Sequence, residues 1–332
     1  MISKDQSVRE QHLAVRNCGG WYDFTHRLLE IEGEDVTAFL DWIFAGAVAR
    51  VKVGGAKYTV MLDASARIRD DVIIFRLEEQ KYWISTLYMR DLIKWLDGHK
   101  GTYRVSYRDV TKDWQMYSVQ GPKARELVNA VAEQPVDELK FFHIADNQMD
   151  GAPIKVARSG YTGEKVGYEI YVSPADEQRL TEKLEAEGTK LGLIHVTEVD
   201  VMAMTLACEK GFVLMMDLWR TNPLEVGFEK SIAWDTEFIG KAALERIREE
   251  GPKRELLGIT VDDLDARIYG GPHGATVMLD GNVIGKTTKY TFSPILNKSI
   301  GYVLVDKGLV KVGDTVEING VKAVISERRF LP

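Results

Sequence analysis

Apolar residues recur with the spacing of an α-helix in the segment 34–44. Val36, Phe39, Leu40 and Ile43 stand at positions i, i+3, i+4 and i+7, so they would line one face of a helix. The pattern therefore predicts a helix with one buried face at this point. The same reasoning predicts helices over 5–17, 92–100, 123–133, 174–191, 196–211 and 238–251.

Runs of β-branched and aromatic residues predict strands over 58–62, 71–77 and 82–88. Beyond residue 251 the pattern changes to short strands separated by turns. The pairs Asp280-Gly281 and Asn319-Gly320 in that part are strong hairpin signals, because both central residues of such a turn need a positive φ. This spacing predicts a small β-barrel or sandwich at the end of the chain.

Composition limits the class of protein. A length of 332 residues suggests two or three domains. Hydrophobic residues make up 45% of the chain, which excludes a disordered protein, and the net charge of −7 argues against a nucleic-acid-binding one. The sequence contains no run of about 18 apolar residues, so it predicts no membrane-spanning helix. The first residues lack the apolar core of a signal peptide. We therefore expect a cytoplasmic protein that binds neither nucleic acid nor membrane.

Metal and disulfide chemistry is not indicated by the cysteines and histidines. The two cysteines, Cys18 and Cys208, cannot make a disulfide framework or a zinc site. The six histidines do not stand at metal-ligand spacing. We therefore expect no metal site.

Two acidic motifs could carry chemistry. Asp70 and Asp71 either lie in a solvated hairpin turn or present a carboxylate that hydrogen-bonds a heterocycle or steers a proton. The loop 160–164, followed by Tyr168 and Glu169, is either a tight loop or a set of aromatic walls for a flat ligand. In the second case Glu169 would accept donors from the edge of that ligand. The residues alone leave both alternatives open.

Seven motifs extend the interpretation when they are taken in order. They are EQHLAVRNCGGWYDFTH, AKYTVMLDASARIRDDVIIF, VQGPKAREL, SGYTGEKVGYEI, NPLEVGF, EFIGKAAL and TTKYTFSPILNKSIGYVLV. In this order, and over nearly the whole chain, they resemble the glycine-cleavage T-protein (aminomethyltransferase) family. The resemblance implies an α+β fold of three subdomains around a central channel that holds tetrahydrofolate, with a C-terminal β-barrel. We expect a first folate-binding subdomain over 1–44 and 113–215, a second subdomain over 45–112 and 216–250, and the barrel over 251–332.

The resemblance also implies roles for individual residues. Asp70 falls on the catalytic aspartate of the family, and Glu169 falls on the carboxylate that recognises the edge of the pterin. The candidates for the aromatic walls around the folate are Tyr58, Tyr161 and Tyr168, and those for the donor side are Tyr22 and His26.

One segment departs from the family pattern. The family helix ARDTLRLEAG reads MAMTLACEKG here, so that Ala203 and Ala207 replace two arginines. The loss argues against an aminomethyl-lipoyl donor. We therefore predict a one-carbon transferase that moves a methyl group from a small methylated substrate to tetrahydrofolate, as the related demethylases do. The alternatives are the aminomethyltransferase of glycine cleavage, with a lipoylated carrier protein as partner, and a non-catalytic folate-binding protein.

Overall fold

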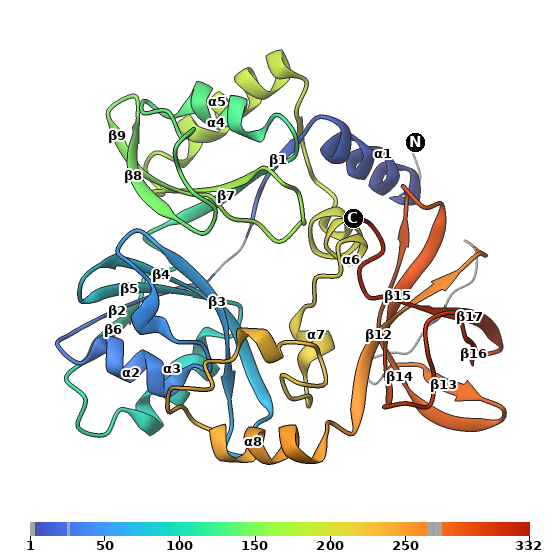
Figure 1. Cartoon of the computed structure of the whole chain (residues 1–332). Helices are drawn as coiled ribbons and strands as arrows, with labels where there is room; N and C mark the ends of the chain where they lie inside the picture. The colour runs from blue at the N-terminus through green and yellow to red at the C-terminus, as the bar shows by residue number, and fades with distance from the viewer. Residues whose placement is uncertain (1–3, 25–26, 264–267, 269–273) are drawn as a thin grey trace.

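The computed structural model describes residues 4–24, 27–263, 268 and 274–332. Three β-sheets with their covering helices are arranged around a common centre (Figure 1). The third sheet is a closed barrel at the C-terminal end of the chain. The α+β class and the C-terminal barrel expected from the sequence are therefore confirmed.

The first sheet has six strands. In spatial order they are β11 (Ile194–His195), β1 (Gly20–Asp23), β7 (Gln115–Gln120), β10 (Gly167–Val172), β9 (Ala152–Ala157) and β8 (Ile144–Met149). Helices α4 (Ala124–Val131) and α5 (Glu177–Leu191) pack against one face and share a core with it that includes Trp21, Val119 and Ile170. The opposite face of this sheet points toward the centre of the molecule (Figure 1).

The second sheet has five strands. In spatial order they are β3 (Ala56–Leu62), β4 (Ile68–Glu78), β5 (Lys81–Thr86), β2 (Arg27–Glu32) and β6 (Ser106–Asp109). Helix α2 (Val36–Ile43) buries Val36, Phe39, Leu40 and Ile43 against this sheet, which confirms the helix expected over 34–44. Helix α3 (Met89–His99) completes the same core. The subdomain boundaries expected from the sequence stay a prediction.

The barrel closes in the order β12-β15-β14-β13-β16-β17. Both predicted hairpin turns are present, with φ of 50° and 80° at Asp280 and Gly281 and of 50° and 78° at Asn319 and Gly320. Positive φ at both central residues matches the right-handed twist of the flanking strands. The barrel strands are β12 (Arg254–Val261), β13 (Thr276–Leu279), β14 (Asn282–Ser293), β15 (Lys298–Asp306), β16 (Thr315–Ile318) and β17 (Val321–Ser326).

Short helical segments join the three sheets near the centre. The helix expected over 196–211 is shorter than predicted, because a π-helical turn at Val201–Thr205 precedes the four residues of α6 (Leu206–Glu209). Figure 1 places α6 and α7 (Met215–Leu218) between the first two sheets and the barrel. The remaining helices are α1 (Lys4–Asn17), α8 (Lys241–Glu250) and the 3-10 turns Val48–Arg50 and Glu229–Ser231.

Neither a membrane span nor a metal cluster is seen in the part of the chain that the structure describes. No helix there is both long enough and apolar enough to cross a bilayer. The same residues contain no group of three or more His, Cys, Asp or Glu side chains that could hold a metal ion.

Candidate functional site

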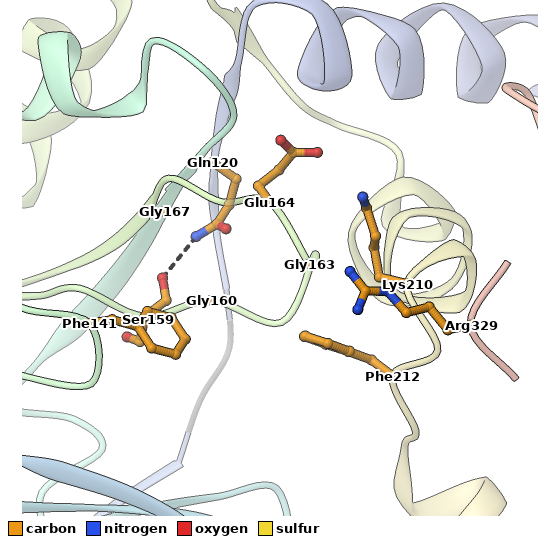
Figure 2. A pocket seen from close by; sticks show the side chains of 10 residues that line it. All are labelled: Gln120, Phe141, Ser159, Gly160, Gly163, Glu164, Gly167, Lys210, Phe212 and Arg329. Atoms are coloured by element: carbon orange, nitrogen blue, oxygen red, sulfur yellow. Dashed lines mark hydrogen bonds between the residues drawn. The ribbon is translucent and has the colours of Figure 1, made fainter. Parts of the chain in front are cut away.

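A large cavity of about 1030 Å³ lies where the three sheets meet. Its lining comes from β3 to β5, the 160–164 loop, the segment from α6 to α7, strand β12 and the residues after β17. A second cavity of about 210 Å³ adjoins it, because five residues line both cavities. The shared residues are Phe141, Gly160, Lys210, Phe212 and Arg329 (Figure 2).

Aromatic side chains form much of the wall of the large cavity. The rings of Phe24 and Tyr161 pack with their centres 4.8 Å apart. Tyr58 meets Phe228 edge to face at 5.8 Å. All four residues line the cavity, so a flat ligand could stack on a ring from either group.

Two acidic residues are among the described residues that line this cavity, Asp71 of β4 and Glu327 after β17. The Tyr58 hydroxyl donates a hydrogen bond to Asp71 Oδ2 at 3.0 Å. Burial raises the pKa of Asp71 to about 6. A buried carboxyl group with such a pKa can exchange a proton near neutral pH.

Asp70, the residue expected from the sequence to be catalytic, is placed differently. Successive side chains of a strand point to opposite faces, so Asp70 of β4 faces away from Asp71. It is 1% exposed and is not among the residues that line the large cavity. Thr86 Oγ1 donates to Asp70 Oδ2 at 2.6 Å, and Oδ1 accepts no hydrogen bond from the described part of the chain. Burial, followed by the nearby charge of Asp71, raises the pKa of Asp70 to about 7.

Glu169 lies on the face of the first sheet that the helices leave uncovered. Like Asp70 it is 1% exposed and is not among the residues that line either cavity, but Ser159, which bonds to it, lines the smaller one. Its strand register places it in one row with Ser118 and Tyr22. Ser159 Oγ and the Tyr171 hydroxyl donate to Glu169 Oε2 at 2.8 and 3.1 Å. Oε1 is buried and accepts no hydrogen bond from a described residue. Burial raises the pKa of this carboxyl group, so it needs a donor to hold a charge.

Three of the tyrosines expected at the site, Tyr22, Tyr161 and Tyr168, lie in or next to the first sheet, and they do not share one face of it. Tyr161 lines the large cavity and interacts electrostatically with Tyr22 and Glu169. Tyr22 is fully buried, and its burial raises the pKa of its hydroxyl to about 12. Tyr168 belongs to the core beneath α4 and α5, and its hydroxyl accepts a bond from Arg125 Nε at 3.2 Å.

The structure therefore brings Tyr22 and Tyr161 to Glu169, and Tyr58 to Asp71. It does not bring Tyr168 to the cavity. The reason is the alternation of side chains along β10, which sends neighbouring residues to opposite faces. His26 lies outside the described residues.

Sequence reasoning missed several residues of the cavity. Arg328 lines it and donates from Nη1 to the Val226 carbonyl oxygen at 2.6 Å, and burial lowers the pKa of its guanidinium. Lys210 and Arg329 were missed as well. No local pattern marks these cations, because they come from the end of α6 and from the segment after β17.

A buried polar network fixes the position of α6. Glu209 at its end accepts bonds from Arg16 Nη2 and from Ser293 Oγ, and its carboxylate lies 3.0 Å from His12 Nε2. These partners come from α1 and the barrel. Of the two alanines that replace the family arginines, Ala203 lines the large cavity and Ala207 is fully buried.

Comparisons with known proteins match nearly the whole chain. The family model described as the GCVT N-terminal domain matches residues 3–236, and that of the glycine cleavage T-protein C-terminal barrel domain matches residues 254–331. The chain is 31% identical to an aminomethyltransferase of Thermoanaerobacter pseudethanolicus, covering 98% of this chain and 89% of the relative. It is 34% identical to an aminomethyltransferase of Bacillus cereus, covering 98% and 90%.

A solved structure shares the fold. The crystal structure of the glycine cleavage system aminomethyltransferase T from Bartonella henselae superimposes with a TM-score of 0.86, at 23% identity, over 98% of this chain and 89% of that one. The two family models together extend over nearly all of the sequence. The chain therefore belongs to the glycine cleavage T-protein family.

Proposed function

We propose that this protein is an aminomethyltransferase, which passes a one-carbon unit from the lipoyl arm of a carrier protein to tetrahydrofolate and releases ammonia. Relatives that share 31% and 34% of their residues with it, over 98% of the chain, carry the name aminomethyltransferase. The sequence alone favours a demethylase, because alanines stand at 203 and 207 in place of two family arginines. The names of these relatives favour the alternative instead.

The observation that carries the proposal is the buried Glu169 with its unpartnered oxygen. Oε2 is fixed by Ser159 and Tyr171, while Oε1 is left to accept a donor from outside the described chain. A pterin is flat and carries N–H donors at its edge, so a carboxylate next to aromatic rings suits it. The residues present therefore fit tetrahydrofolate, which when bound supplies the nitrogen that accepts the one-carbon unit.

Asp71 is our candidate for proton handling. Its carboxyl group lines the cavity and is held by Tyr58. With a pKa of about 6 it is largely ionised at neutral pH and can still take up a proton. We assign it the task of orienting the acceptor and of moving the proton that accompanies loss of ammonia.

The mouth of the large cavity suits an apolar arm. Leu87, Phe141, Phe212 and Met216 line the cavity and are between 39% and 57% exposed. Apolar side chains at such a rim favour an apolar chain over a charged one. We infer that the lipoyl arm enters here.

The proposal is tested by incubating the purified protein with tetrahydrofolate and the aminomethyl-lipoyl form of a carrier protein. Mass spectrometry of the folate should detect methylenetetrahydrofolate, and ammonia should appear in equal amount. Folate binding without turnover from any donor would instead indicate a non-catalytic folate-binding protein.

A second candidate keeps the acceptor and changes the donor. Ala203 lines the cavity at the position of a family arginine, and Leu214 and Met215 line the same cavity. The absence of that arginine favours a small methylated donor and hence a demethylase. A panel of vanillate, syringate, dimethylsulfoniopropionate and betaine-type compounds separates the two, because only a demethylase would form methyltetrahydrofolate from one of them.

A further inference from the structure

A buried ion pair lies behind the wall of the large cavity. Lys289 of β14 and Asp217 of α7 have fully buried side chains, and their Nζ and Oδ2 atoms are 2.9 Å apart. Neither residue is among those that line either cavity. Removing two opposite charges from water costs free energy that their attraction often fails to return. Stability alone therefore gives no reason for a charged pair at this place.

Hydrogen bonds fix the position of both charges. Lys289 Nζ also donates to the Phe212 carbonyl oxygen at 3.2 Å. Asp217 Oδ1 accepts a bond from Thr288 Oγ1 at 2.6 Å, and Oδ2 accepts one from the Leu214 N–H at 2.9 Å. The ammonium and the carboxylate are therefore held in one defined arrangement.

The pair fastens part of the cavity wall to the barrel. Residues 211–216 line the large cavity without interruption. The carbonyl oxygen of Phe212 is bound by Lys289, and the N–H of Leu214 is bound by Asp217. Two backbone groups of this wall thus depend on the ion pair for their hydrogen bonds.

The same pair lies next to the strand that carries Asp71. Helix α7 packs against both β4 and β14, so it places Asp217 between Asp71 and the barrel. Burial is the largest cause of the raised pKa of Asp71; the charge of Asp217 raises it further, and the charge of Lys289 lowers it. The effects of the two charges oppose each other while the pair is intact.

Other groups face Asp71 from the neighbouring elements. Tyr58 of β3 donates a hydrogen bond to it, and Asp70 precedes it on β4. Tyr88, which follows β5, senses its charge, and Arg328, which follows β17, interacts with Tyr58. None of these groups is altered when Lys289 or Asp217 is replaced, so the contribution of the ion pair can be measured by itself.

We propose that Lys289 is a positioning residue for the proposed reaction. It fixes the 211–216 wall, and it compensates the negative charge of Asp217 so that Asp71 stays ionised at neutral pH. The inference rests on the proposed function, because that function assigns the handling of the proton to Asp71. Lys289 does not line the cavity, so it acts only through the wall and through Asp71.

Two variants that break the same ion pair test this role. In Lys289→Met the uncompensated charge of Asp217 opposes ionisation of Asp71, so the midpoint of the acid limb of kcat/KM should rise by about 0.5–1 pH unit. In Asp217→Asn the uncompensated charge of Lys289 favours ionisation, so the midpoint should fall by a similar amount. The double variant lacks both charges, and its midpoint should return close to that of the wild type.

Lys298→Met and Asp262→Asn are matched controls. They break an exposed ion pair of the barrel, with Nζ and Oδ1 2.7 Å apart, and neither residue lines a cavity. We expect no movement of the midpoint in either control. A purely structural role of Lys289 would affect both single variants in the same way, so any pattern other than opposite movement overturns the proposal. If one single variant does not fold, the other is compared with the double variant, from which its midpoint should differ in the stated direction.

A measurement without folate separates this inference from the proposed function. The carboxyl titration of Asp71 is followed by ¹³C NMR of protein labelled at aspartate, and the signal is assigned by its loss in Asp71→Asn. Opposite movement of this titration in Lys289→Met and Asp217→Asn supports the role of Lys289 even if the wild type turns over no folate. If the wild type forms methylenetetrahydrofolate but the titration is the same in all variants, this inference fails and the proposed function stands.

Discussion

Replacing Asp71 by Asn tests which of two neighbouring carboxylates handles the proton. The change keeps the size of the side chain but removes the group that lines the cavity next to Tyr58. Loss of a positioned acid or base lowers turnover by about 10²–10⁴-fold, which corresponds to about 3–5 kcal/mol of transition-state stabilisation. We expect kcat/KM to fall within that range while tetrahydrofolate still binds.

Asp70→Asn is the matched control. The substitution is chemically identical and one residue earlier, but its side chain faces away from the cavity and bonds to Thr86. We expect kcat/KM to change by less than about tenfold, which corresponds to less than about 1.4 kcal/mol. The resemblance to the family instead implies the catalytic role, and hence the large loss, for Asp70.

The pH profile gives a second readout of the same claim. The pKa of Asp71 is raised to about 6, and the ionised form is the one that accepts a proton. The kcat/KM of the wild type should therefore fall as the pH drops below about 6, and that limb should be missing in Asp71→Asn. A large loss in Asp70→Asn with near-normal turnover in Asp71→Asn would refute the assignment.

Stability provides further tests. The pKa of Asp70 rises from 3.8 to about 7 on folding, so the folded protein holds a proton that the unfolded chain releases. This group therefore lowers the free energy of unfolding as the pH rises from about 4 to 7, by up to about 4 kcal/mol. Urea unfolding should show Asp70→Asn to be more stable than the wild type at pH 8, and equal stability at every pH would rule out a buried charge. Lys289 and Asp217 form an ion pair with both side chains fully buried, with Nζ and Oδ2 2.9 Å apart. Lys289→Met should cost about 3–5 kcal/mol, and adding Asp217→Asn should recover part of it; a single variant as stable as the wild type would contradict this.

Local sequence patterns predicted those elements whose conformation is determined by residues that are close together in the sequence. The helix at 34–44 follows from one apolar stripe, and α2 buries those four side chains. The two hairpins of the barrel follow from Asp280-Gly281 and Asn319-Gly320, which adopt the positive φ that such turns require. In both cases the determining interactions lie within a few residues.

Side-chain direction was harder to predict. Strand β4 is apolar on both faces, with Val72 and Ile74 on one side and Ile73 and Phe75 on the other. The pattern therefore does not say which of Asp70 and Asp71 meets the cavity. Alternation does show that Tyr168 and Glu169 face opposite ways, but not which face is covered by helices.

The cations of the cavity could not be predicted from local sequence. Lys210 and Arg329 meet only because the segment after β17 packs on the end of α6. Lysine and arginine are ordinary surface residues, so their types give no signal. Their meeting depends on contacts between residues more than a hundred positions apart.

Titration of tetrahydrofolate into the wild type and Glu169→Gln measures the central claim most directly. The substitution replaces the buried carboxylate and its unpartnered Oε1 by a neutral amide. Glu126→Gln, an exposed residue of α4, is the control. We predict that the wild type and the control bind equally well and that Glu169→Gln binds about 10- to 100-fold more weakly. A wild type that does not bind tetrahydrofolate, or a Glu169→Gln variant that binds it as tightly as the wild type, would contradict the account.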